Sequence, residues 1–251
     1  MMKTFTPTSE KEMIDTLTGI FEGGSYCTIA DSPTDTKGGL SFGKHQVSEM
    51  QGTLLTLLKK YTNKPAAIPA NVSALNLHIA RFNPAGTKYT GTSPQRDGFK
   101  RDLKMACTDP AMQQAQDEFF DTVYLIPALQ HASDFGIVTA LGRSIFYDVA
   151  IQSGPNRTTF YIAALARWNS ERPGIHATAC ASKDITGPDE KTFLAYVGNA
   201  RRTAMLSASS SKDYRASVYR PDEFDKLLTA GNFDLKTDFV FRGCQINGLP
   251  G

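Results

Sequence analysis

Residues 9–24 read SEKEMIDTLTGIFEGG, and this segment carries both end signals of an amphipathic helix. Ser9 followed three residues later by Glu12 is a capping box, which satisfies the first free amides of a helix. The pair Gly23-Gly24 ends the pattern, because glycine readily leaves the helical conformation. The apolar residues between these ends fall on one face at helical spacing, at Met13, Leu17, Ile20 and Phe21. The segment therefore predicts a packed helix with a carboxylate, Glu22, in its last turn.

Helical signals continue through most of the 251 residues, so we expect a mainly α protein that forms one domain over residues 1–251. Asp109-Pro110 is typical of an N-cap followed by proline at the first helical position. Residues 62–98 look irregular, and a short β-like piece spans Gly39–Phe42. The further helices are expected over residues 48–61, from 110 towards 127, and over 134–152, 158–168, 189–207 and 221–230.

The composition argues against several classes of partner. Lys and Arg number 27 against 25 Asp and Glu, and a net charge of +2 is too small to indicate a nucleic-acid partner. No apolar run approaches the roughly 18 residues of a membrane helix, so we expect no membrane insertion. The N-terminal residues lack the apolar stretch of a signal peptide, and the sequence leaves the localisation unassigned.

The four cysteines, at positions 27, 107, 180 and 244, lie far apart in the chain and lack the close pairs that zinc sites use. We therefore expect neither a metal nor another cofactor. Buried free thiols are favoured over one or two disulfides, because a chain of this length needs no covalent staples.

Glu22 is a candidate general acid. The partial negative charge at a helix C-terminus and the adjoining apolar residues Ile20 and Phe21 are expected to raise the pKa of Glu22. A carboxyl group that is partly protonated near neutral pH can donate a proton to a leaving group. The alternative is an ordinary solvated glutamate, and position alone does not separate the two.

Asp35 lies 13 residues further on, in the glycine-containing segment Thr34–Gly39. A loop carboxylate facing a helix-end acid is the arrangement that glycoside hydrolysis uses, and a separation of roughly 6.5–9.5 Å is typical of inverting enzymes. An Asx-turn residue is the alternative interpretation of Asp35, and Asp31 is a rival for the same catalytic role.

The order of these acids resembles that of the family 46 glycoside hydrolases, the chitosanases of the lysozyme-like clan, in which a helix-end Glu precedes an Asp-Gly-Arg-Gly-Tyr loop. The resemblance continues in the same order over most of the chain, through Gln113–Gln116, Val123-Tyr124, Pro127-Ala128, Phe146–Asp148, Gly154-Pro155, Asp189-Glu190, Ala200-Arg201, Ala204–Leu206, Ala230–Asn232 and Asp234-Leu235.

This resemblance implies a lysozyme-like fold of two lobes, with a small β element beside an active-site cleft, and a single catalytic domain. It implies an inverting mechanism in which Glu22 is the general acid and Asp35 the general base. It also implies a buried ion network behind them, with Asp148 and Arg201 at two positions and Arg215 as a looser match for the third. A buried Asp is tolerable only when it is paired.

The chain departs from the family pattern around the expected site. A threonine that helps to hold the water is missing at its strict position, where Thr36 or Ser41 would substitute. The acid that grips a substrate ammonium group in chitosanases falls at about Thr53. His45 and Gln46 would bind sugar substituents, although a plain loop role is an equal alternative.

These departures favour an anionic substrate. The pI of about 8.3 and several lysines near the expected site favour it as well, because a basic surface attracts anionic polymers. Residues 38–46, GGLSFGKHQ, also resemble the chitosanase-like muramidases of phage lysins and antibacterial effectors. We therefore expect an endo-acting hydrolase of peptidoglycan that acts on an extracellular or periplasmic cell wall. Alternatives are a chitosanase and a non-catalytic wall-binding module. We expect a monomer, and the resemblance to effectors leaves room for an immunity protein as partner.

Overall fold

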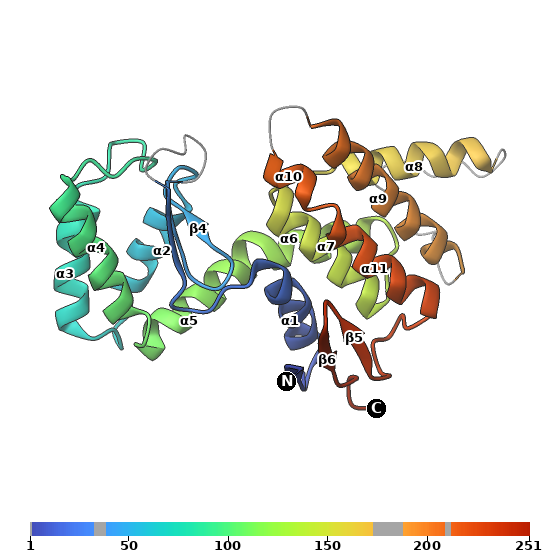
Figure 1. Cartoon of the computed structure of the whole chain (residues 1–251), viewed down its shortest axis with the longest axis horizontal. Helices are drawn as coiled ribbons and strands as arrows, with labels where there is room; N and C mark the ends of the chain where they lie inside the picture. Colours follow the sequence, from blue (N-terminus) through green and yellow to red (C-terminus); the bar gives the residue numbers. More distant parts are fainter. Residues whose placement is uncertain (1, 33–38, 173–187, 209–211) are drawn as a thin grey trace. The chain divides into compact units, whose positions relative to one another are not determined.

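A computed structural model describes residues 2–32, 39–172, 188–208 and 212–251. The chain divides into two compact units (Figure 1). Residues 1–21 and 123–251 form the first, here named the terminal unit, and residues 22–122 form the second, the inserted unit. Both are built mainly from helices, which confirms the expected mainly α fold of two lobes.

The terminal unit encloses a helix that is buried along most of its length, α7 (Ala140–Ser153) (Figure 1). Aromatic rings pack against it, and the rings of Phe146 and Tyr161 stack with their centres 4.1 Å apart. The other helices of this unit are α1 (Glu10–Glu22), α6 (Ile126–Asp134), α8 (Thr159–Glu171), α9 (Pro188–Ser207), α10 (Lys212–Ala216) and α11 (Tyr219–Ala230). A π-helical turn, η1 (Asp121–Leu125), precedes α6.

A three-stranded sheet joins the two ends of the chain in the terminal unit. Strand β1 (Thr4–Phe5) pairs in parallel with β6 (Cys244–Ile246), which pairs antiparallel with β5 (Phe239–Phe241). The sequence patterns did not predict these strands, because each has only two or three residues and alternation cannot be recognised over so short a run.

Helix α1 follows the prediction closely. The Ser9 hydroxyl accepts a bond from the Glu12 amide at 3.2 Å, as an N-cap should. The Glu12 carboxylate accepts from the amide of Thr8 at 2.8 Å, so the reciprocal half of the capping box is displaced by one residue. The side chains of Met13 and Leu17 are fully buried. These contacts fix the helix that ends at Glu22.

The inserted unit contains an antiparallel sheet of β2 (Ile29–Ser32), β3 (Gly39–Phe42) and β4 (Val47–Ser48). Strand β3 has the bounds that the sequence predicted. Four helices complete the unit: α2 (Thr53–Thr62), α3 (Pro69–Ile79), α4 (Ser93–Ala106) and α5 (Pro110–Phe120). The Asp109 carboxylate accepts from the Ala111 amide at 2.9 Å, which confirms the predicted N-cap of α5.

The expectation that residues 62–98 are irregular is wrong, because α3 and the start of α4 lie there, side by side (Figure 1). Helix α4 buries only a narrow stripe of Phe99, Leu103 and Ala106 beneath a strongly charged surface, so few of its residues are apolar. Its start is marked by a capping box between Thr92 and Gln95. That local signal was the more informative one in this segment.

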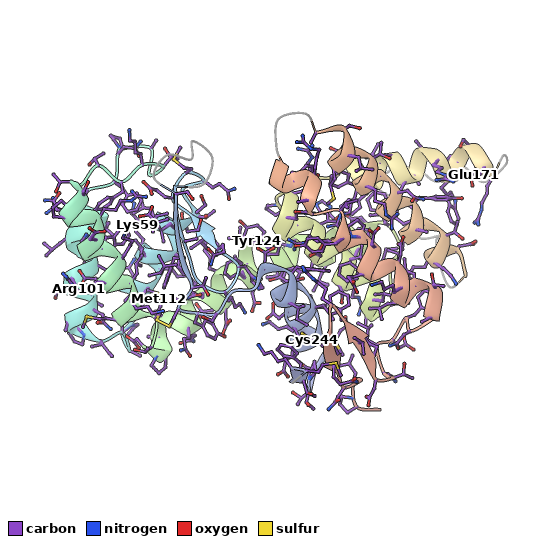
Figure 2. All side chains as sticks on the ribbon, in the orientation of Figure 1. Lys59, Arg101, Met112, Tyr124, Glu171 and Cys244 are labelled. Carbon is purple, nitrogen blue, oxygen red and sulfur yellow. A yellow bond between two sulfur atoms is a disulfide. The ribbon has the colours of Figure 1, made fainter. Side chains whose placement is uncertain are left out.

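The preference for free thiols is wrong for two of the cysteines. Cys27 and Cys107 form a disulfide, with their Cα atoms 5.0 Å apart. The chain before β2 packs against the end of α4, which brings together two residues 80 positions apart in the sequence. Cys244 is a free, half-buried thiol on β6 (Figure 2). Cys180 lies outside the described residues.

Within the part of the chain that the structure describes, every helix is too short or too polar to cross a membrane. The same residues contain no group of three or more His, Cys, Asp or Glu side chains arranged to hold a metal ion.

Candidate active site

Glu22, the predicted proton donor, is the last residue of α1 and is half-buried. Gly23 follows with a φ of +61°, a conformation that glycine adopts without steric cost and that ends the helix. The preceding ring, Phe21, is buried against Phe224 and Phe241, with ring centres 5.5 and 5.0 Å away. The helix end that carries Glu22 is therefore anchored in an aromatic cluster.

A buried ion network lies in the terminal unit, to which Phe21 also belongs. The Asp148 carboxylate on α7 is fully buried and contacts two guanidinium groups, those of Arg201 on α9 and Arg220 on α11, each at 2.6 Å. Burial alone would raise the pKa of Asp148, but the charges of Arg220 and Arg201 hold this pKa below its ordinary value. The carboxylate is therefore ionised and compensated, and the predicted pairing of Asp148 with Arg201 is confirmed.

The assignment of Arg215 to this network is wrong, because the second arginine is Arg220. Arg215, on the short helix α10, donates to the backbone carbonyl of Ala208. Arg220 lies on the buried face of α11, which it shares with Phe224, Leu227 and Leu228. The helical spacing of these four residues is visible in the sequence, and it is the signal that could have identified the correct arginine.

Arg220 also connects the network to the helix that ends at Glu22. Its guanidinium lies 4.8 Å from the centre of the Phe21 ring, within the range of a cation–π contact. Phe21, the residue next to Glu22, is thus in contact with Arg220 of the buried ion network. The network thus contacts this helix end through Phe21.

Asp35 and Thr36, the predicted base and a predicted supporting residue, lie outside the described residues. The strands on either side are described. Ser41, the other supporting candidate, lies in β3, where it pairs with Ala30 of β2 and Ser48 of β4. Its half-buried side chain is thus carried by the central strand of the sheet.

Asp31, the rival for the catalytic base, is held in an ion cluster. Its carboxylate accepts from Nε and Nη2 of Arg96 at 2.8–3.1 Å and lies 3.2 Å from the ammonium of Lys100. The bonds from Arg96 lower the pKa of Asp31. Lowered basicity and a bidentate cationic partner make Asp31 a poor acceptor for the proton of a water molecule.

The sequence analysis missed Glu49 and Arg96, which form the centre of the inserted unit's polar interior. The buried Glu49 carboxylate accepts bonds from the amides of Leu40 and Tyr89, at 3.0 and 2.6 Å, and from Nη2 of Arg96 at 2.8 Å. Neither residue belongs to a recognisable motif. Their pairing depends on the packing of α4 against the sheet.

The three residues expected to bind substrate have structural partners. The His45 ring is buried and meets the Phe120 ring edge-on at 4.7 Å. Gln46 donates from its amide to the carbonyl of Gly43 at 2.8 Å. The hydroxyl of Thr53, at the start of α2, accepts from the amide of Ser48 at 2.8 Å.

The lysines near the expected site are largely neutralised by acids on α5. Lys44 lies 2.6 Å from Asp117, and Lys60 and Lys64 each lie 2.9 Å from Glu118. Lys59, labelled in Figure 2, is exposed on α2. The inference of a basic surface suited to an anionic polymer is therefore weakened, because counting lysines in the sequence ignored their partners.

Comparison with known proteins identifies relatives over most of the chain. The sequence model of glycosyl hydrolase family 46 matches residues 27–239. A chitosanase from Streptomyces sp. is 31% identical over 192 residues, and one from Bacillus subtilis is 26% identical over 235 residues. These matches cover 73% and 90% of this chain, and they span 60% and 79% of the length of the two relatives.

Solved structures of similar fold include a mutant chitosanase from Bacillus subtilis MY002 complexed with 6 GlcN, with a TM-score of 0.73 and 23% identity over 96% of this chain and 98% of the other. A family 46 chitosanase from Gynuella sunshinyii, in complex with chitotetraose, has a TM-score of 0.71 and 21% identity over 98% and 99% of the two chains. Because both identities are below 25%, the structural likeness is evidence for the fold alone.

Proposed function

The chain belongs to glycosyl hydrolase family 46, and from this membership we propose that it is an endo-acting, inverting glycoside hydrolase whose substrate is chitosan. The observation that carries the proposal is the family match over residues 27–239, together with relatives that are chitosanases. We propose further that residues 1–251 work as one catalytic domain of two lobes and that the protein acts as a monomer.

In the proposed reaction, the Glu22 carboxyl donates its proton to the glycosidic oxygen as the bond between that oxygen and C1 breaks. Asp35 takes a proton from a water molecule, whose oxygen bonds to C1 from the opposite face of the sugar. The products are two shorter chains, and the new reducing end has the inverted configuration. Both proton transfers use carboxylates of this chain.

The buried ion network supports the role of Glu22. Asp148, Arg201 and Arg220 form a compensated cluster, and Arg220 contacts the ring that directly precedes Glu22. A proton donor must be held in place if protonation is to coincide with bond cleavage. We propose that Asp148 and its two arginines supply this support from behind the helix.

The charge pairs of the inserted unit support chitosan over peptidoglycan. Chitosan is a polycation, and free lysines at the site would repel it. Lys44, Lys60 and Lys64 are instead paired with Asp117 and Glu118. The expectation of peptidoglycan relied on Lys37, Lys44, Lys59 and Lys60, of which Lys44 and Lys60 are paired, Lys59 is exposed and Lys37 lies outside the described residues. The relatives are chitosanases. Hydrolysis of peptidoglycan is therefore an alternative for the experiment to decide.

The test measures the release of reducing ends from chitosan and, separately, from purified peptidoglycan. We expect the wild-type chain to hydrolyse chitosan, and Glu22→Gln to lose nearly all activity while it stays folded, because an amide is too weak an acid to protonate the glycosidic oxygen. The matched control is Glu10→Gln at the other end of α1, which should retain activity. Release from peptidoglycan alone, or an active Glu22→Gln variant, would contradict the proposal.

A further inference from the structure

The hairpin β2–β3 brings together the residues on either side of the Asp35 segment. Asp31 pairs with Leu40, and Ser32 pairs with Gly39, which makes these the last two rungs of the ladder before residues 33–38. Asp35 is three residues beyond Ser32 and four before Gly39 in the sequence. Contacts that hold these two rungs therefore fix where the segment leaves the sheet and where it returns.

Arg96 of α4 holds the first of the two strands. Its guanidinium donates from Nε to both carboxylate oxygens of Asp31 at 3.1 Å and from Nη2 to Oδ1 at 2.8 Å. Lys100, one turn further along the same helix, adds a contact of 3.2 Å to Oδ2. The side chain of Asp31 is largely buried by these partners.

The same guanidinium holds the second strand through Glu49. Nη2 of Arg96 lies 2.8 Å from Oε2 of Glu49, and that oxygen also accepts from the amide of Leu40 at 3.0 Å. The amide of Glu49 donates in return to the carbonyl of Leu40 at 2.8 Å. Gly39 fits closely here, because a Cβ at this position would lie 3.0 Å from Oε2 of Glu49.

We propose that Arg96 is a positioning residue for the catalytic base: one largely buried guanidinium ties the two strands that flank the Asp35 segment to helix α4, directly at Asp31 and through Glu49 at Leu40. This inference rests on the proposed function, because it takes Asp35 as the base. Glu49 and Asp31 act with Arg96 as the two arms of the connection.

The chemistry of the contact explains why arginine is required. The planar guanidinium offers five donors in a fixed fork and engages both carboxylates at once. Lysine keeps the positive charge but offers a single ammonium, which cannot reproduce the bidentate contact with Asp31 and the contact with Glu49 together. Arg96→Lys therefore removes the bridge that Arg96 forms between Asp31 and Glu49, while a positive charge stays near both carboxylates.

A matched control lies on the same helix. Asp102, six residues after Arg96, accepts from the buried His78 ring of α3 at 2.8 Å. The contacts recorded for Asp102 reach His78 and Arg101 and involve neither β2 nor β3. Asp102→Asn disturbs a polar contact of α4 of similar burial and should leave the contacts of Arg96 with Asp31 and Glu49 intact.

The experiment compares wild type, Arg96→Lys, Asp102→Asn and Asp35→Asn. It measures kcat and KM on chitosan, and hydrogen exchange of the amides in residues 29–32 and 39–42. We expect Arg96→Lys to lower kcat by about 10- to 100-fold, since a displacement of about 1 Å costs on the order of 100-fold, with KM changed by less than about threefold. Exchange in the two strands should quicken in this variant and not in Asp102→Asn.

The outcomes separate this inference from the function on which it rests. If Arg96→Lys keeps its kcat while Asp35→Asn loses activity, the inference is wrong and the proposed function stands. Equal losses of kcat in Arg96→Lys and Asp102→Asn would also overturn it, because they would indicate general destabilisation. No chitosan hydrolysis by wild type, or full activity of Asp35→Asn, would contradict the proposed function and this inference together.

A second variant keeps the test decisive if Arg96→Lys does not fold. Glu49→Gln preserves the volume and an acceptor for the Leu40 amide but removes the charge that Arg96 binds. We expect kcat to fall by several-fold with KM nearly unchanged. An unchanged kcat in a folded Glu49→Gln variant would overturn the inference.

Discussion

Replacement of Arg220 by methionine tests the buried ion network most sharply. The change removes a guanidinium that lies 2.6 Å from a fully buried carboxylate and 4.8 Å from the centre of the Phe21 ring. Asp148 would keep Arg201 as its remaining cationic partner. Loss of one member of a buried ion pair costs about 3–5 kcal/mol, and here the cost arises because Oδ1 of Asp148 loses the guanidinium that donates to it in a medium that cannot solvate it.

The size of the effect follows from the same contacts. The lost cation–π contact with Phe21 adds about 0.5–2 kcal/mol, part of which a methionine sulfur near the ring restores. For a unit of this size, a destabilisation of about 3–5 kcal/mol lowers the melting temperature by roughly 6–20 °C. Circular dichroism during thermal unfolding measures the change in melting temperature directly. Activity on chitosan, measured below the unfolding transition, shows whether Glu22 is still held in place.

Arg215→Met is the matched control, because Arg215 binds a backbone carbonyl and not Asp148. We expect its melting temperature to fall by no more than a few degrees. The double change Asp148→Asn with Arg220→Met should be less stable than Arg220→Met alone, because the buried Arg201 guanidinium then loses the carboxylate that compensates its charge. Equal shifts for Arg220→Met and Arg215→Met, or a double variant more stable than the single one, would refute the argument.

Three further outcomes are expected. The pKa of Asp148 is lowered in the folded state, so the contribution of this carboxylate to stability is complete above its unfolded pKa of about 3.9 and is lost as the pH falls through its folded pKa. Arg220→Met should therefore unfold at a higher pH than wild type when both are titrated with acid. Unfolding of both proteins at the same pH would contradict this. The double variant Cys27→Ser with Cys107→Ser should have a free energy of unfolding about 2–4 kcal/mol lower than wild type in denaturant titration, whereas Cys244→Ser should lower it far less. Equal denaturation midpoints for these variants would contradict this. Gly39→Ala should lower the free energy of unfolding of the inserted unit by roughly 1–3 kcal/mol in the same assay, because a residue with a side chain is strained at a φ of +58°. An unchanged denaturation midpoint would contradict this.

Local signals in the sequence predicted much of the fold. The cap at Ser9, the glycines after Glu22, the N-cap at Asp109 and the β-like piece at Gly39–Phe42 all depend on neighbouring residues, and the structure has elements at each of them. Helices α3 and α4 were missed because one is apolar with little periodicity and the other buries a narrow stripe. In α4 the capping box carried more information than the period.

Residues joined over long sequence distances were harder to predict. Asp148 and Arg201 were found through resemblance to a family, and Arg220 was missed although it shares a helical face with three buried apolar residues. Glu49 and Arg96 are 47 positions apart, and Cys27 and Cys107 are 80 apart. Such partners are set by the packing of helices on the sheet, which no local pattern specifies. The positive charge near the site was overestimated for the same reason, because the acids that pair with its lysines lie on α5.

The configuration of the first products tests the central claim most directly. Proton NMR of chitosan oligosaccharides, recorded within the first minutes of hydrolysis and before mutarotation, reports the anomer that the enzyme releases. A β-1,4 substrate cleaved by an acid at Glu22 and a water-activating base should first give the α-anomer. Initial release of the β-anomer would contradict the inverting account, because it would require a carboxylate that attacks C1 itself.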